Sequence, residues 1–315
     1  MLDGIAVGMV ERILYLKKLP ALAGLPTADL AAIAELQVER SVRAGEVLLK
    51  AGEESRGVYF VLEGAVDCHR RGRFVGRVGP GGGLGGLVLF AQDRDGVEAV
   101  AATDGRVLEL DGESLLDVFE DRFRVLHHVL RGTCRQLLDL VIRSRAKPFQ
   151  SLASVAPPKY PTREAKDLDL VERIFFLRSI VPFQRSSINA LAELSRTTTQ
   201  VRFPAGTVLW KAGEVGSTAY LILEGTVAGR VAESGVTFST GPGAPLGASE
   251  MMAELPRWYD ATAETVVVAL QGSTEALLDV FEDNYEMARD YLALWARAVL
   301  TIIESNLDAE GPMPF

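Results

Sequence analysis

The spacing of hydrophobic and polar residues passes through the same three stages twice along the chain. Residues 10–40 place apolar side chains at helical intervals. From 42 to 110, short β-branched runs are interrupted by glycine at intervals of about 8–12 residues, which is typical of antiparallel strands. Helices from about 167, strands from 201 to 270 and a helix from about 273 repeat this order. A long helix is also predicted from Asp111, with one apolar face made of Leu115, Phe119, Phe123, Leu126, Leu130, Leu137 and Val141.

The two halves of the chain also repeat one another residue by residue. Segment 44–53 returns as 205–214, and 115–121 returns unchanged as 277–283. The spacing is 161 residues for the first pair and 162 for the second, so one residue was inserted between them. A repeat of this length indicates a duplicated domain rather than a solenoid of short units. We therefore expect a mixed, mainly β fold of two tandem antiparallel β-roll (jelly-roll-like) domains, each flanked by N-terminal and C-terminal helices.

The repeat also predicts the domain boundaries. The first domain is expected at 1–143 and the second, with its C-terminal helix, at 167–315. Between them lies a proline-containing linker, 144–166, whose composition predicts a fairly stiff connection.

Charge and composition indicate a cytoplasmic, bacterial protein. The net charge is −9, and no apolar run reaches the roughly 18 residues that a membrane helix needs. The chain contains only two cysteines, which fits a reducing compartment. Its 26 arginines against 7 lysines suggest a GC-rich bacterial genome. Local basic clusters exist, and the cluster at 69–73 is predicted to be a solvated hairpin tip. With a negative net charge, we expect no DNA binding and no membrane association.

Candidate catalytic and metal chemistry is sparse. His127 and His128 are neighbours on a predicted helix, where adjacent side chains point about 100° apart and do not easily share a metal. The glycine run 81–86 lacks the lysine of a phosphate-binding loop, and no nucleophile–base set can be placed together. We therefore predict no catalytic residues, no metal site and no enzymatic activity.

Several of the repeated motifs resemble the cyclic-nucleotide-binding domain family, found in bacterial catabolite activators and in regulatory subunits of the cAMP-dependent kinase. They are the opening 16–30, the strand motif 59–64 and the turn 78–81. The resemblance covers roughly 10–143 and 171–304. It implies a ligand cassette after that turn, in which backbone N–H groups of a short helix meet a cyclic phosphate. A glutamate directly after a glycine would accept from the ribose 2′-hydroxyl, and an arginine farther on would pair with the phosphate.

In the first copy, the resemblance places the cassette at 84–90. Gly85 is the leading glycine, Gly86 occupies the glutamate position and Asp95 occupies the arginine position. A glycine offers no acceptor, and an aspartate repels phosphate. We expect this degenerate cassette not to bind a cyclic nucleotide.

In the second copy, the cassette falls at 246–252 and keeps half of the recognition pair. Gly247 leads it, Ala248 stands at the glutamate position with Ser249 after it, and Arg257 stands at the arginine position. Trp258 either fills the pocket, which we prefer, or stacks on a base. Glu250 lies two positions beyond the usual glutamate, on a different helix face, and is not counted as a substitute. The missing charged hydrogen bond is worth roughly 1.5–3 kcal/mol.

Two functions remain open at this point. The first is a non-catalytic signalling adaptor that acts through protein contacts, with nucleotide binding lost in the first domain and weak or lost in the second. The alternative is a ligand-responsive regulator that senses a cyclic nucleotide or another phosphate anion through the second domain. No cofactor is expected, apart from a cAMP-like or cGMP-like ligand there. The terminal helix carries an a/d seam that packs on its own domain or forms a homodimer: Tyr285, Ala288, Leu292, Trp295, Val299 and Ile302.

Overall fold

A computed structural model describes residues 7–19, 22–93, 96–144 and 167–309. The chain divides into two compact units. The first unit comprises Met1–Thr133 and Trp295–Phe315, and the second comprises Cys134–Leu294. The predicted linker 144–166 lies outside the described residues except for Ser144. The domain boundaries expected from the repeat remain a prediction, because the units group residues by contact rather than by repeat.

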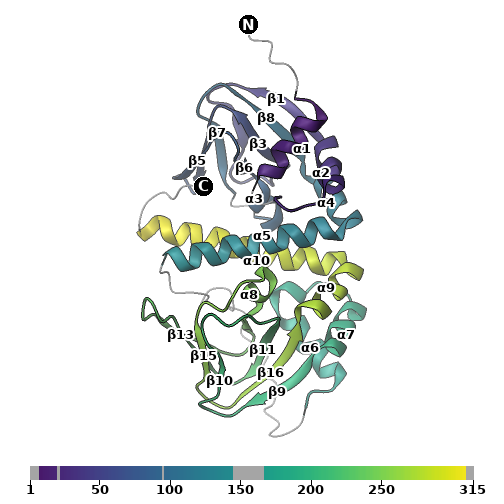
Figure 1. Cartoon of the computed structure of the whole chain (residues 1–315), viewed down its shortest axis with the longest axis vertical. Coiled ribbons are helices and arrows are strands. Elements are labelled where there is room, and N and C mark those ends of the chain that lie inside the picture. Colours follow the sequence, from purple (N-terminus) through teal and green to yellow (C-terminus); the bar gives the residue numbers. More distant parts are fainter. Residues whose placement is uncertain (1–6, 20–21, 94–95, 145–166, 310–315) are drawn as a thin grey trace. The chain divides into compact units, whose positions relative to one another are not determined.

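Two four-stranded antiparallel sheets form the β-roll of the first unit (Figure 1). One sheet has the order β1-β8-β3-β6 and the other β2-β7-β4-β5. The strands are β1 (Gln37–Val42), β2 (Val47–Leu49), β3 (Gly57–Glu63), β4 (Val66–Arg70), β5 (Arg73–Val78), β6 (Gly83–Leu84), β7 (Glu98–Ala101) and β8 (Gly105–Asp111). The helices are α1 (Met9–Lys18), α2 (Thr27–Glu35), α3 (Gly86–Ala91), α4 (Gly112–Asp121) and α5 (Phe123–Ser144).

The second unit repeats this topology strand for strand. Its sheets have the orders β14-β11-β16-β9 and β10-β15-β12-β13, again antiparallel. The strands are β9 (Thr199–Phe203), β10 (Val208–Trp210), β11 (Thr218–Glu224), β12 (Val227–Arg230), β13 (Thr237–Thr240), β14 (Pro245–Leu246), β15 (Asp260–Ala263) and β16 (Val267–Ser273). The helices are α6 (Leu170–Ser179), η1 (Val181–Phe183), α7 (Ile188–Thr197), α8 (Ala248–Ala253), α9 (Thr274–Asp283) and α10 (Tyr285–Ala309). The predicted fold class is confirmed.

Matching glycines make the matching turns. Gly64 and Gly225 both adopt left-handed φ angles, 85° and 84°, directly after β3 and β11. A Cβ on Gly64 would lie 2.8 Å from the carbonyl oxygen of Asp104, and one on Gly225 would lie 2.1 Å from that of Val266. Only glycine fits the conformation and the close approach, which explains why both copies keep it.

The long helix predicted after each set of strands is in fact two helices. The first pair breaks at Arg122, with φ −135° and ψ 75°, and the second breaks at Asn284, with φ −134° and ψ 70°. Both conformations lie outside the helical region. The prediction of one continuous helix from Asp111 is therefore wrong, because the apolar spacing continues through the break and does not reveal it.

The unit boundaries fall inside α5 and α10. The first unit contains Phe123–Thr133 of α5 and the part of α10 that begins at Trp295, and the second contains the remainder of both helices. Four seam positions of α10, Ala288, Leu292, Trp295 and Val299, are buried within the single chain. A homodimer through this helix stays a prediction. No helix among the described residues is both long enough and apolar enough to cross a membrane.

Candidate functional site

The second cassette begins where β14 ends. Gly247 adopts a left-handed conformation, φ 75° and ψ 8°, and is the N-cap residue of α8. All six residues of this short helix are buried, including Ala248 and Ser249. The predicted glutamate position therefore carries only a buried methyl group, which cannot accept a hydrogen bond.

Arg257 is buried, with 3% of its surface exposed, and its side chain faces back toward the start of α8. Its Nη1 donates to the carbonyl oxygen of Gly247 at 2.7 Å, and its Nη2 donates to that of Thr218. The guanidinium also lies over the ring of Trp210, with Cζ 4.4 Å from the ring centroid. Carbonyl oxygens and an aromatic face thus surround the group that would meet a phosphate in the family's binding mode.

Two glycines make room for this guanidinium. A Cβ at Gly247 would lie 2.2 Å from Nη1 of Arg257, and a Cβ at Gly216 would lie 2.8 Å from Nη2. The backbone N–H of Arg257 also donates to the carbonyl of Glu214 at 2.8 Å. Both the backbone and the side chain of Arg257 are therefore fixed by main-chain partners within the second unit.

Aromatic side chains fill the interior of the second roll. Trp258 stacks on Phe238 at a centroid distance of 5.9 Å and meets Tyr259 edge-on at 4.9 Å. Tyr259 in turn packs edge-on against Trp210 at 5.5 Å. Trp210, Phe238 and Tyr259 belong to one buried cluster with Ile222, Leu246 and several small side chains. The half-buried Trp258 packs against this cluster. One face of Trp258 is thus in contact with Phe238, and its predicted roles as plug or base-stacking platform remain predictions.

Glu250 also belongs to this site, although its position in the sequence differs from that of the family's glutamate. Its side chain is 1% exposed, and its Oε2 accepts from the Ser249 hydroxyl at 2.8 Å. Burial raises the pKa of Glu250, while a backbone hydrogen bond, the Ser249 hydroxyl and the positive charge of Arg257 lower it by less. An acidic residue inside a stretch of alanine, serine and methionine was the available signal. Such a neighbourhood favours burial of the carboxyl group.

The first cassette has the same backbone without the same chemistry. Gly85 has φ 91°, and a Cβ there would lie 2.4 Å from the carbonyl oxygen of Gly57. Gly86 opens α3 at the predicted glutamate position and offers no side-chain acceptor. Asp95, the residue at the predicted arginine position, lies outside the described residues.

Arg70 corrects the prediction for the basic cluster 69–73. Arg71 and Gly72 form the expected exposed turn, with φ angles of 49° and 74°. Arg70 itself is only 7% exposed, and its Nη1 pairs with Asp93 at 2.6 Å. Its Nε donates to Glu304 of α10. The prediction of a solvated turn is therefore right for Arg71 and Gly72 and wrong for Arg70. It fails for Arg70 because the partner, Glu304 on α10, is 234 residues away in sequence.

Both cysteines lie in the interior of the protein. Both Cys68 and Cys134 are buried and unpaired with one another. Burial raises the pKa of Cys68 to about 12 and that of Cys134 well above its ordinary value. Over the described ranges, no three His, Cys, Asp or Glu side chains gather as ligands for a metal ion.

Known proteins that are similar to this chain include relatives in sequence and many solved structures. A protein of Rhodopseudomonas palustris, predicted to be a potassium channel, is 29% identical over 102 residues, which are 31% of this chain and 24% of that protein. A regulatory subunit of a cAMP-independent protein kinase A from Trypanosoma brucei is 16% identical, with a TM-score of 0.36, and covers 98% of this chain and 92% of its own. The regulatory domain of Toxoplasma gondii protein kinase A with cAMP is 15% identical, with a TM-score of 0.34 and coverages of 92% and 97%.

The family model for the cyclic nucleotide-binding domain matches twice, at 39–122 and at 200–284. Together the two matches cover more than half of the 315 residues, and each spans one β-roll with its cassette. The chain therefore belongs to the cyclic nucleotide-binding domain family and carries two tandem copies of that domain.

Proposed function

We propose that this chain is a non-catalytic signalling adaptor of its family, which acts through protein contacts and has lost nucleotide binding in the first domain. In the second domain, binding is weak or lost. The observation that carries the proposal is the position of Arg257, whose two Nη atoms donate to the carbonyl oxygens of Gly247 and Thr218. The residue that would recognise a phosphate already binds the protein.

The energetic argument has two parts. A phosphate would have to displace both carbonyl acceptors, and hydrogen bonds from a charged group are worth about 1.5–3 kcal/mol each. The ribose acceptor is absent as well, because Ala248 ends at a methyl group. Each deficit of that size lowers affinity by about tenfold to more than a hundredfold. Gly86 and Asp95 support the same conclusion for the first domain, where neither member of the recognition pair is present.

The alternative proposal is that the second domain senses a cyclic nucleotide or another phosphate anion. Its support is that Arg257 is present at the family's position and buried beside the cassette. Under this proposal, the guanidinium leaves Gly247 and Thr218 and pairs with the ligand. Gly247, Ala248, Ser249 and Trp258 would then line the bound anion or its base.

Isothermal titration of the whole chain with cAMP and cGMP separates the two proposals. The adaptor predicts no heat up to millimolar ligand. A sensor predicts micromolar binding that disappears in Arg257→Ala and weakens in Arg257→Lys, which keeps the charge but loses the planar fork. A matched variant, Ala248→Glu, restores the missing carboxylate at the position that would accept from the ribose 2′-hydroxyl. If Ala248→Glu alone produces binding, the remaining pocket is open and only the acceptor is missing.

A further inference from the structure

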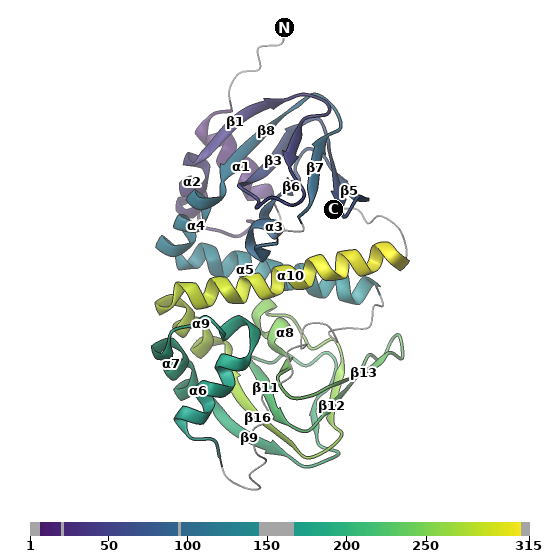
Figure 2. The ribbon, with the colours of Figure 1, turned by 180° about the vertical axis from the view of Figure 1, so that it is seen from behind.

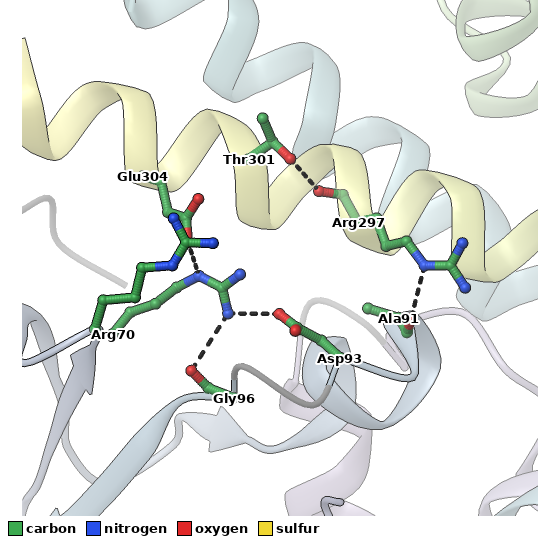
Figure 3. Close-up of polar contacts among 8 residues, drawn as sticks. Arg70, Ala91, Asp93, Gly96, Arg297, Thr301 and Glu304 are labelled. Atoms are coloured by element: carbon green, nitrogen blue, oxygen red, sulfur yellow. Dashed lines mark hydrogen bonds and ion pairs between the residues drawn. The ribbon is translucent and has the colours of Figure 1, made fainter. Parts of the chain in front are cut away.

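The first cassette helix is held at its C-terminal end by α10. Nε of Arg297 donates to the carbonyl oxygen of Ala91, the last residue of α3, at 2.8 Å (Figure 3). The last carbonyls of a helix have no partner within the helix, and a cation there interacts favourably with them. The backbone N–H groups of Gln92 and Asp93 meet the carbonyls of Leu89 and Val88, and Arg297 adds a partner for the carbonyl of Ala91.

Apolar contacts reinforce this cap. Ala91 of α3 and Ala296 and Leu300 of α10 form one buried cluster, with Leu87 and Phe90 packed against it. All five residues belong to the first unit. In both views the C-terminal part of α10, in bright yellow, runs past α3 toward the β5 end of the first roll (Figures 1 and 2).

Three charged side chains, Arg70, Asp93 and Glu304, form a second contact between α10 and the first roll, which we name the latch. Arg70 at the end of β4 pairs with Asp93 at 2.6 Å and donates to the carbonyl of Gly96 at 3.4 Å. It also pairs with Glu304 of α10, as Figure 3 shows. The side chains of Asp93 and Glu304 are only 15% and 25% exposed, so solvent screens the three charges less than it would at an open surface. The latch thus joins the loop after α3, the end of β4 and α10.

The cap has an equivalent in the second unit, whereas the latch has none. Nε of Arg135 on α5 donates to the carbonyl of Ala253, the last residue of α8, at 2.8 Å. Arg135 and Ala253 stand 162 positions from Arg297 and Ala91, so both caps descend from one repeated pair. The positions that correspond to Glu304, Asp93 and Arg70 are filled by uncharged side chains, namely Ile142, Leu255 and Val231.

We propose that the part of α10 from Trp295 to Ser305 is a strap that holds the first cassette in one fixed position. The strap comes from the second copy of the sequence and acts on the first. It consists of the Arg297 cap, the apolar cluster and the Arg70 latch. This inference stands whether or not the second domain binds a nucleotide, because every contact in it lies within the first unit.

Hydrogen exchange of this 315-residue chain, measured by mass spectrometry, tests the strap. Glu304→Gln removes one charge of the latch with little change in size, and Arg297→Ala removes the cap. Each is expected to speed exchange in peptides from 86–93 by about tenfold, the effect of losing one charged hydrogen bond on a local opening. Exchange in peptides from 248–254 should stay unchanged. The matched control, Arg135→Ala, should speed exchange in 248–254 and leave 86–93 unchanged.

Two results would overturn the strap. One is unchanged exchange at 86–93 in both Glu304→Gln and Arg297→Ala. The other is an equal increase in every part of the chain, which would mean general destabilisation. If Arg297→Ala does not fold by circular dichroism, Glu304→Gln decides alone, because it alters a partly exposed side chain near the end of α10.

Discussion

Replacing Gly247 by alanine tests directly whether Arg257 is held against the cassette backbone. A Cβ at this position would lie 2.2 Å from Nη1 and 2.8 Å from Cζ of Arg257, so the guanidinium would have to leave the Gly247 carbonyl. The φ of 75° adds strain, because the left-handed region costs an L-residue roughly 1–2 kcal/mol. With the loss of one charged hydrogen bond, the expected cost in unfolding free energy is about 2.5–5 kcal/mol.

Gly206→Ala is the matched control for backbone strain. Gly206 has φ 84°, and a Cβ there would meet nothing within 4 Å, so only the strain of roughly 1–2 kcal/mol applies. Urea unfolding followed by tryptophan fluorescence measures both variants, since Trp210 and Trp258 both lie in the second roll. In an Arg257→Ala background, the cost of Gly247→Ala should fall to that of Gly206→Ala, because the clash is gone.

The reasoning about Arg257 fails if Gly247→Ala and Gly206→Ala cost the same. It also fails if Gly247→Ala costs the same with and without the arginine, because the side chain would then not lie against Gly247. Either result would mean that the guanidinium is not held by the Gly247 carbonyl and is free to meet a ligand. The main support for lost nucleotide binding would then be removed.

Three further measurements address the cysteines, the buried acid and a helix cap. Native Cys68 and Cys134 should resist a thiol reagent at mildly alkaline pH, since burial raises both pKa values, and both should react once the chain is unfolded. The raised pKa of Glu250 means that the folded state holds its proton more tightly, so stability falls as pH rises above 4.5. Glu250→Gln should therefore raise the melting temperature near pH 7 and lose that advantage below pH 4.5. Asp111→Ala should cost about 1 kcal/mol in thermal unfolding, because Asp111 accepts from the backbone N–H of Ser114 at the start of α4.

The duplicated sequence was sufficient to predict the fold class and the order of its elements. Strand spacing and turn glycines are local properties of the sequence, and each copy indicates the same strands and turns independently. The breaks at Arg122 and Asn284 were missed for a physical reason. The identical stretches 115–121 and 277–283 keep helical apolar spacing up to the break, and the spacing resumes after it.

Long-range partners explain what the sequence did not reveal about the site. The stripes on α5 and α10 indicated which positions are buried, but periodicity does not say what covers them. Arg70 looked like part of a solvated turn because its partner Glu304 is remote in sequence. Arg257 was found from its spacing alone, yet its bonds to Gly247 and Thr218 depend on backbone positions that no motif encodes.

Besides the equivalent caps made by Arg297 and Arg135, each cassette contacts a further arginine that differs between the two units. In the second unit, Arg257 belongs to the loop after α8 and binds carbonyls of its own domain. In the first unit, Arg70 extends from the end of β4 and pairs with Asp93, which follows α3, and with Glu304 of α10. A loop bound in this way must break charged hydrogen bonds before it can close on a ligand, which opposes a ligand-driven change. An adaptor needs a surface whose shape does not depend on a small molecule, and two buried guanidinium groups would provide that constancy in two domains that began as copies.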